Sequence, residues 1–390
     1  MNVIKDAVHG NVRLSDFELS LLDTQAMQRL RHVKQVEMAN LIYPGANHTR
    51  FEHSIGTMYL AGEMAESAGV KGEEERMLRA AALLHDVGHG AFSHESERLM
   101  LRHLKKGHEE MGWERVKEGE IAERIKAEGI SLAELKKAFF GKGVGELITF
   151  DLGADRMDYL LRDSHYTGVA YGVIDYGRLI HTIRLNAKGK VVVESGGLEA
   201  AESMLIARFL MFSSVYYHHA VRIASSMLRK ACEIAVKERT IAARSVADMT
   251  DEQLLLALAE NRRASVLVKR LRERRLLKRA VEMGAYELSP GLVRRLADDR
   301  FVEKMEGEIA AGAKVSADEL IVDLAPEYNK EETKVRVSRK GGEERSLREI
   351  SEIVRAIEQA EQGRRKLIVA CPAEEREKVG KAAKKMLSSF

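Results

Sequence analysis

Apolar residues recur along most of residues 15–285 at the spacing of amphipathic helices. Over residues 15–38 they follow a period close to 3.6, with one break at residues 23–24, and turn residues mark 43–48 as a loop. The same period predicts helices over about 51–68 and 72–85, and over 94–104, 108–128, 131–139, 144–163, 198–237 and 250–283. The chain is therefore expected to be helical up to about residue 285.

The pattern changes after about residue 300. Short apolar runs at 320–324, 334–338 and 367–370 predict strands, 339–342 predicts a turn, and 346–362 and 373–387 predict helices. We expect a mainly α protein in which a helical bundle is followed by a small C-terminal α+β lobe. The expected domains are a core over 1–240, a helical extension over 241–300 and the lobe over 301–390.

Composition and charge exclude several classes of protein. No run of about eighteen apolar residues occurs in the chain, which excludes a membrane-spanning helix. The first residues lack the basic and apolar segments of a secretory signal, and two cysteines cannot form a disulfide framework, so we expect a cytoplasmic protein. With 63 basic and 60 acidic residues the net charge is +3, so overall charge does not indicate nucleic-acid binding.

Histidines are confined to one part of the chain. All 13 lie between His9 and His219, so chemistry that depends on imidazole is expected there. Together with acidic residues they form four short segments, at 50–54, 84–94, 107–110 and 154–159. Imidazole and carboxylate are the ligands of divalent iron, manganese, cobalt or zinc.

Four residues of these segments can form a metal site in the core of a helical bundle. They fall at the ends or in the middle of different expected helices, and facing helices can bring such side chains to one ion. The four are His53, His85, Asp86 and Asp155. A lone His-Asp pair is more often structural, so the metal interpretation depends on the wider pattern.

The order His53, His85–Asp86, Asp155 resembles the signature of the HD-superfamily metal phosphohydrolases. Within that superfamily the chain is similar to the deoxynucleoside triphosphate triphosphohydrolases. It especially resembles the branch of the animal sterile-alpha-motif/HD-domain enzyme and its prokaryotic relatives, without a sterile-alpha-motif module. Matching stretches occur at residues 5–10, 23–31, 43–53, 84–94, 155–163 and 215–219, and the resemblance covers roughly residues 3–285. It implies an HD-domain helical bundle that assembles as a homo-tetramer or dimer.

The resemblance implies that the four residues hold a divalent ion of iron, manganese, zinc, cobalt or nickel, with magnesium or manganese on the substrate triphosphate. The ion would polarise the α-phosphate and activate water. A triphosphate carries about four negative charges, so nearby cations are needed as well. The family's phosphate-contacting positions are occupied here by Arg50, Arg156 and Arg208.

A second set of histidines matches those that surround the α-phosphate in the family. These are His89, His94 and His108. His94 is the one expected to protonate the departing 5′ oxygen, because imidazole titrates near neutrality. Each of these histidines taken alone would more often be structural.

The resemblance also implies how the sugar is recognised. Gln35 and Asp163 match residues that bond the 3′-hydroxyl, while Tyr159 and Tyr216 would pack against the deoxyribose. A tyrosine ring close to C2′ would clash with a ribose hydroxyl and so exclude ribonucleotides. The alternative for both tyrosines is ordinary helix packing.

A further set resembles the family's regulatory nucleotide site, which would bind GTP or a deoxynucleotide as activator. Positions that read a guanine and its phosphates are matched by Asp23, Gln28 and Arg31 in the N-terminal regulatory segment, and positions contacting an adjacent deoxynucleotide by Arg178, Arg274 and Lys278. Two positions depart from the family pattern. Lys5 replaces an amide residue, and Gly153 replaces an acidic residue. The alternative for the set is a solvated helix face.

These features predict a metal-dependent enzyme that hydrolyses deoxynucleoside triphosphates to deoxynucleoside and inorganic triphosphate. One alternative is an HD phosphohydrolase acting on a nucleotide monophosphate or a phosphodiester. Another is a non-catalytic nucleotide-sensing or nucleic-acid-binding protein. Seven basic residues within 269–279 would form a positive helix face able to contact phosphates, but no aromatic residues are interleaved with them. No membrane partner is expected.

Overall fold

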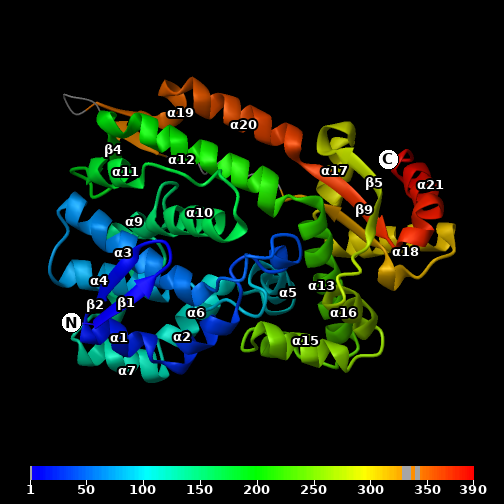
Figure 1. The fold of residues 1–390 in the computed structure, drawn as a ribbon, viewed down its shortest axis with the longest axis horizontal. Coiled ribbons are helices and arrows are strands. Elements are labelled where there is room, and N and C mark those ends of the chain that lie inside the picture. The colour runs from blue at the N-terminus through cyan, green and yellow to red at the C-terminus, as the bar shows by residue number, and fades with distance from the viewer. Residues whose placement is uncertain (1, 327–334, 339–342) are drawn as a thin grey trace.

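The computed structural model of the chain describes residues 2–326, 335–338 and 343–390. The α-helices up to residue 182 are α1 (Asp16–Leu22), α2 (Gln25–Arg29), α3 (Arg50–Ala68), α4 (Glu73–Leu84), α5 (His94–Leu104), α6 (His108–Val116), α7 (Gly119–Ala127), α8 (Leu132–Phe139), α9 (Glu146–Thr149), α10 (Ala154–Thr167) and α11 (Tyr176–Thr182). Those that follow are α12 (Leu198–Met211), α13 (His219–Lys237), α14 (Ala243–Val246), α15 (Asp251–Ala259), α16 (Ala264–Arg272), α17 (Pro290–Arg295), α18 (Asp299–Ala313), α19 (Leu347–Ile350), α20 (Glu352–Arg364) and α21 (Arg376–Leu387). The fold is mainly α, as predicted (Figure 1).

Three small sheets accompany the helices in the described part of the chain. Their strands are β1 (Asn2–Asp6), β2 (Gly10–Leu14), β3 (Ile183–Leu185), β4 (Val191–Glu194), β5 (Lys278–Gly284), β6 (Ile321–Leu324), β7 (Arg336–Ser338), β8 (Glu344–Ser346) and β9 (Lys366–Cys371). β1 and β2 form an antiparallel hairpin, and the other sheets have the orders β3-β4-β7-β8 and β5-β9-β6. The strands predicted near 320–324, 334–338 and 367–370 are confirmed where the structure describes them. The turn expected at 339–342 lies outside the described residues.

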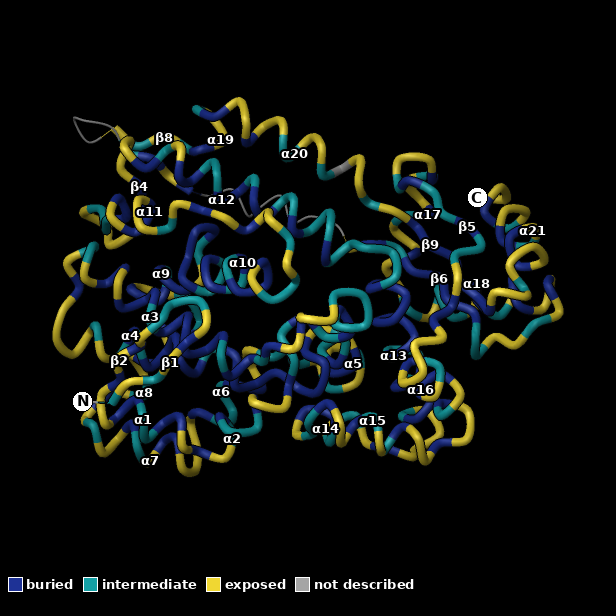
Figure 2. Tube along the Cα trace, in the orientation of Figure 1, coloured by how far each residue is buried: buried dark blue, intermediate teal, exposed yellow. Residues whose placement is uncertain are grey.

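The largest hydrophobic core is built around α3, α4 and α10. Its members include Met58 and Leu60 of α3, Leu83 of α4 and Leu160 of α10, all fully buried. Figure 2 shows many buried residues along α3 and α10, with exposed residues mainly on the outer helices and loops. Since α3 and α10 pack against each other, residues on their facing sides are held at fixed separations.

A second core joins α5, α13, α15 and α16, and a third fills the C-terminal lobe beneath β5, β6 and β9. The described segments from residue 335 onward are shared between the lobe and the first hydrophobic core. β7 pairs in parallel with β4, and Val337 and Leu347 are buried in the first core. From there α20 runs back beside α12 toward β9 and the lobe (Figure 1). The domain boundaries at 240 and 301 stay predictions, although the lobe's sheet takes its strand β5 from before residue 301.

Several predicted helices are shorter than expected. The helix over 15–38 ends with α2, because Val33 is extended and Lys34 forms a β-bridge with Thr49. The expected helix over 108–128 is split into α6 and α7, and that over 144–163 into α9 and α10. The helix over 198–237 is interrupted by a π-helix at Phe212–Tyr216, which is a common feature of functional sites.

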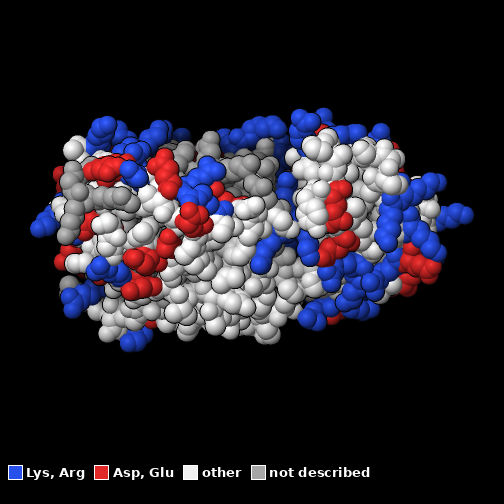
Figure 3. Space-filling model, turned by 90° about the horizontal axis from the view of Figure 1, so that it is seen from above, with Lys and Arg blue, Asp and Glu red and all other residues white. Residues whose placement is uncertain are grey.

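The expected helix over 250–283 is wrong at its end. α16 stops at Arg272, Arg274 has a positive φ of 53°, and the chain then enters β5. The basic residues of 269–279 therefore do not share one helix face. Several pair with acidic side chains, for example Arg270 with Glu319 at 2.5 Å. On the face shown in Figure 3, basic side chains are likewise mixed with acidic ones.

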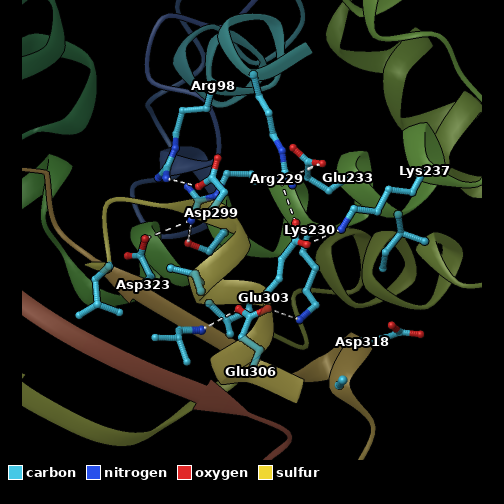
Figure 4. Close-up of a pocket in the computed structure, with 18 of the residues that line it drawn as sticks. Arg98, Arg229, Lys230, Glu233, Lys237, Asp299, Glu303, Glu306, Asp318 and Asp323 are labelled. Atoms are coloured by element: carbon cyan, nitrogen blue, oxygen red, sulfur yellow. Dashed lines mark hydrogen bonds and ion pairs between the residues drawn. The ribbon is translucent and has the colours of Figure 1, made fainter. Parts of the chain in front are cut away.

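A charged cavity of about 250 Å³ lies where the lobe meets the rest of the protein. It is lined by residues of α5 and α13 and by residues of α18 and β6. Arg229 of α13 pairs with Asp323 of β6 and with Glu95 of α5. Arg98 of α5 reaches Asp299 at the start of α18 (Figure 4). Within the described part of the chain, no helix combines the length and apolar character needed to cross a membrane.

Candidate active site

The four predicted metal ligands meet in the largest core. His53 lies in the first turn of α3, His85 and Asp86 follow α4, and Asp155 lies in the first turn of α10. His53 Nε2 is 3.1 Å from Asp155 Oδ1 and 3.7 Å from Asp86 Oδ2. His85 Nε2 is 3.3 Å from Asp86 Oδ1 and 3.8 Å from Asp155 Oδ1. Donor atoms at these separations can share one ion at ligand distances of about 2.0–2.2 Å.

Two histidine orientations fit a metal ion. The Nδ1 atom of His85 lies 2.7 Å from the carbonyl oxygen of Ala82, so it donates there and leaves Nε2 as an acceptor. That Nε2 is buried and makes no hydrogen bond. His53 in turn directs Nδ1 to the carboxylate of Asp158 at 2.7 Å, which leaves its Nε2 facing Asp86 and Asp155. Fixing one ring nitrogen so that the other can bind metal is the usual second-shell arrangement.

The electrostatics of the site also favour a cation. Burial lowers the pKa of His53, but hydrogen bonds to Asp155 and Asp158 outweigh burial and raise the pKa to about 10. The charged groups joined to His53 by ion pairs, directly or through at most two intervening residues, are four carboxylates and two guanidiniums, a net charge of −2 when the histidines are neutral. They are Asp6, Asp86, Asp155, Asp158, Arg50 and Arg162. A divalent ion would balance this charge, so the residues present fit one.

The second histidine set adjoins the first through Asp86. His89 Nε2 lies 3.3 Å from Asp86 Oδ1, and its ring stacks on His108 with centroids 4.0 Å apart. This stacking needs a close approach of α6 to the loop after α4. A Cβ at Gly88 would lie 1.9 Å from the carbonyl oxygen of His108, so only glycine permits it.

Glu97 of α5 joins two of these histidines. Its carboxylate oxygens lie 2.5 Å from His108 Nδ1 and 3.2 Å from His94 Nδ1. Burial raises the pKa of Glu97, but the hydrogen bonds from the two histidines outweigh it and hold the pKa well below its ordinary range. The His94 side chain is 62% exposed, so its ring can reach a substrate. Glu97 therefore orients His94 and His108 at the mouth of the site.

The three predicted phosphate contacts differ in their surroundings. Arg50 is buried, donates from Nη1 to Asp86 at 2.5 Å and has Nη2 3.4 Å from His94 Nε2. Arg208 lies over the ring of Phe212 at 5.0 Å and lowers the pKa of Tyr159, although burial raises that pKa overall. Arg156 follows Asp155 on α10 and donates to Asp151 at 2.5 Å. The structure places Arg50 at the metal candidates, and Arg208 on the tyrosine side.

The predicted sugar-binding residues form a cluster between α10 and the π-helix. Tyr216 donates its hydroxyl hydrogen to Asp163, and the Tyr159 and Tyr216 rings meet edge-on at 6.4 Å. Asp163 also accepts a hydrogen bond from His48 Nε2 at 2.7 Å. Gln35 has its side-chain oxygen buried without a hydrogen-bond partner. The structure thus brings these polar and aromatic side chains close together.

The predicted regulatory residues are dispersed within one chain. Arg31 donates to Gln28 at 2.9 Å and lies 3.6 Å from the centroid of the Phe51 ring. Arg178 donates to the carbonyl of Gly196, and Arg274 to that of Leu41, while Asp23 ends α1 and Lys278 begins β5. α2, α11 and α16 lie far apart in Figure 1. Among the described residues no hydrogen bond or ion pair links the first three to the last three.

Three residues that sequence reasoning did not assign to the site have clear positions in it. They are Asp158 behind His53, Glu97 between two histidines, and His48 on Asp163. Asp158 follows Asp155 by three residues and Glu97 follows His94 by three, so the helical spacing was a usable signal. His48 lies in a loop, where no such period applies.

Comparison with known proteins agrees with this geometry. The HD domain family matches residues 50–163, and the HD associated region matches residues 174–388. An uncharacterized protein of Methanocaldococcus jannaschii is 38% identical over 296 residues, 74% of this chain and 62% of its own. A deoxynucleoside triphosphate triphosphohydrolase SAMHD1 homolog of Dictyostelium discoideum is 31% identical over 201 residues, 46% of this chain and 38% of its own.

Solved structures include the same fold over nearly the whole chain. A hypothetical protein from Aquifex aeolicus superposes with a TM-score of 0.80 and 29% identity, covering 98% of this chain and 99% of the other. The two curated relatives, in contrast, are matched over only 62% and 38% of their own lengths. The HD domain match, at residues 50–163, includes the segments that carry the His and Asp cluster.

Proposed function

The chain belongs to the HD-domain proteins that carry the HD associated region, and from this premise we propose that it hydrolyses deoxynucleoside triphosphates to deoxynucleoside and inorganic triphosphate. The observation that carries the proposal is the junction of two histidine groups at one carboxylate. Asp86 belongs both to the group with His53 and His85 and to the group with His89 and His108. The proposed metal site and the proposed α-phosphate site are therefore adjacent and have Asp86 in common.

His53, His85 and Asp86 would hold a divalent ion, whose chemistry would be Lewis acidity and activation of water. The chain's own residues then have distinct tasks around the α-phosphate. Arg50 contributes a buried guanidinium beside Asp86, and His108 is held by Glu97. His94 has its Nδ1 on Glu97, so its Nε2 is the atom that can donate a proton to the departing 5′ oxygen.

The sugar cluster supports a deoxynucleotide as the substrate. Asp163, held by His48 and Tyr216, can accept a hydrogen bond from a 3′-hydroxyl while Gln35 offers a second polar group. The Tyr159 and Tyr216 rings, which meet edge-on at 6.4 Å, would pack against the apolar C2′ edge of a deoxyribose and would clash with a hydroxyl there. The resemblance of the chain to the SAMHD1 triphosphohydrolases is consistent with this choice.

The test is to incubate the protein with each deoxynucleoside and ribonucleoside triphosphate in Mn²⁺ or Mg²⁺ and to separate the products by anion-exchange chromatography. Inorganic triphosphate and deoxynucleoside are expected. Pyrophosphate or phosphate as the first product, or hydrolysis only of monophosphates or diesters, would refute the proposal in favour of another HD phosphohydrolase. Asp86→Asn should be inactive, and Asp16→Asn, an exposed carboxylate on α1, should match the wild type.

We further propose that a nucleotide bound away from the metal activates the enzyme by assembling chains. Arg31 lies over Phe51, two residues before His53, so a ligand on Arg31 would touch the helix that carries a metal candidate. Arg274 follows α16 and Lys278 begins β5, elements that lie apart from α2 in Figure 1, so a nucleotide shared with Arg31 would need a second copy.

Linkage requires that a nucleotide which favours the oligomer binds the oligomer more tightly. Sedimentation and steady-state kinetics of Asp23→Ala and Arg31→Ala, with and without GTP or a deoxynucleotide, test this. Both variants are expected to lose nucleotide-dependent assembly while keeping metal. If neither assembly nor the rate curve changes, the enzyme is constitutive.

A further inference from the structure

The turn of the N-terminal hairpin places a histidine inside the protein. Asp6 builds this turn, because its Oδ1 accepts hydrogen bonds from the backbone N–H groups of Val8 and His9, both at 2.8 Å. The side chain of His9 is fully buried, and its Nε2 lies 2.7 Å from Oδ1 of Asp158, 149 residues further along the chain. The Nδ1 of His9 has no hydrogen-bond partner. The neutral tautomer that donates from Nε2 satisfies this geometry.

Asp158 is the centre of a closed set of hydrogen bonds. Its Oδ1 accepts from His9 Nε2 and from Arg162 Nη2 at 2.9 Å, and its Oδ2 accepts from Arg162 Nε at 2.9 Å and from His53 Nδ1 at 2.7 Å. Arg162 Nη1 then donates to Oδ2 of Asp6 at 3.0 Å, which returns to the hairpin turn. Both carboxylate oxygens of Asp158 are therefore held from two sides.

The neighbouring helix is shaped for this carboxylate. A Cβ at Gly56 of α3 would lie 1.9 Å from Asp158 Oδ1 and 2.4 Å from Arg162 Nη2, so any larger residue would displace the group. His9 itself packs beside Tyr59 of α3, with ring centroids 5.1 Å apart. The hairpin, α3 and α10 thus converge on one buried carboxylate that touches a predicted metal ligand.

We propose that His9 is a positioning residue for the metal site, which acts on His53 through Asp158. His9 and Arg162 fix the plane of the Asp158 carboxylate, and that plane fixes the tautomer and the ring orientation of His53. His53 Nε2 is thereby directed at Asp86 and Asp155 before an ion arrives. This inference rests on the metal site of the proposed function, but it does not depend on the identity of the substrate.

The ligand site has a direct readout in Co²⁺, whose absorption spectrum reports ligand geometry. The variants are His9→Phe, which keeps the ring volume without a donor, and His9→Asn, whose shorter amide stops before Asp158. His9→Gln carries an amide that can reach the position of Nε2. Asn11→Ala is the matched control, because it removes only the exposed bond between Asn11 and Lys5 on the same hairpin.

Each protein is loaded with Co²⁺, and its dissociation constant is measured by competition with a chelator. His9→Phe and His9→Asn are expected to bind Co²⁺ about tenfold more weakly and with an altered spectrum, the lower end of the effect of outer-shell partners. His9→Gln should restore both properties to near wild type, and Asn11→Ala should not change them. Thermal unfolding of the metal-free proteins identifies any variant that fails to fold. If either His9→Phe or His9→Asn fails to fold, the Co²⁺ affinity and spectrum of the other variant test the inference.

Affinities of His9→Phe and His9→Asn within about twofold of the wild type, with an unchanged spectrum, would overturn the inference. So would a His9→Gln variant as weak as His9→Asn, because the hydrogen bond would then not be the cause. The positioning role and the proposed function can fail independently of each other. If the wild type binds Co²⁺ and these variants weaken it, the positioning role holds even when no deoxynucleoside triphosphate is cleaved.

Discussion

Replacing Asp323 by asparagine tests the connection between the C-terminal lobe and the helices that carry the site. Asp323 Oδ2 accepts from Arg222 Nη2 at 2.5 Å and Oδ1 from Arg229 Nη2 at 3.1 Å. Arg229 also pairs with Glu95 of α5, one residue after His94 (Figure 4 shows Arg229 and Asp323 pointing toward each other). The carboxylate of Asp323 is 10% exposed, so solvent screens these pairs only weakly.

The contribution of Asp323 to the folding free energy follows from its pKa. Burial raises this pKa, but Arg222 and Arg229 outweigh burial and lower it from 3.8 to about 2. That difference corresponds to about 2 kcal/mol of folding free energy. Because the folded-state pKa is depressed, the contribution is fully present above pH 3.8 and is lost as the pH falls through about 2. Asparagine resembles the protonated carboxyl, so the variant should approach the wild type at low pH.

Urea unfolding followed by circular dichroism at pH 7, 4 and 3 measures the difference. Asp323→Asn should be about 2 kcal/mol less stable than the wild type at pH 7 and about 1 kcal/mol less stable at pH 3. Asp299→Asn is the control, because its pair with Arg98 in the same cavity is 35% and 43% exposed, and solvent screening leaves it well under about 1 kcal/mol. Equal losses for both variants, or a loss at Asp323 that does not change with pH, would refute the reasoning.

Three further predictions concern the site. Asp86→Ala should lose bound metal and essentially all turnover, since it removes a charged ligand shared by both histidine groups, and full metal occupancy with near-normal activity would contradict this. Tyr216→Ala should raise kcat/KM for ribonucleotides relative to deoxynucleotides, and an unchanged ratio would return Tyr216 to a packing role. Glu97→Gln should lower kcat by up to about a hundredfold with little change in KM or metal content, because it weakens the hydrogen bonds that hold His94 and His108. A parallel loss of bound metal would show that Glu97 acts through the metal site and not through these histidines.

The ligand candidates could be predicted from the sequence because their chemistry restricts both residue type and local order. His85 and Asp86 are adjacent, and His53 and Asp155 each lie in the first turn of a helix whose period is visible. Helix ends were harder to predict, because tertiary contacts override propensity. Lys34 leaves the helical path to bridge Thr49, and the π-helix before Tyr217 interrupts a continuous apolar period.

Chain segments that pair far from their neighbours in sequence also escaped prediction. The basic and apolar residues near Lys278 fit a helix as well as a strand. The strand forms because residues 366–371 of β9 pair with β5 from 82 to 93 positions away. The parallel pairing of Val193 with Val337 likewise places a late segment on the first hydrophobic core. A local pattern carries no information about such partners.

The residues that hydrogen-bond to the metal-ligand candidates were only partly predictable, because the fold, and not the local sequence, brings some of them together. Asp158 and Arg162 are four apart on α10, so their bond could be read as a helix pair, and Asp158 is three residues from Asp155. Nothing local connects them to His9 in the hairpin. A buried carboxylate beside a metal ligand nevertheless needs donors for both oxygens, because unsatisfied charge is costly in the core. Arg162 of α10 donates to both oxygens and His53 of α3 to one of them, and the hairpin turn adds His9 as a further donor to Oδ1, beside Gly56 of α3.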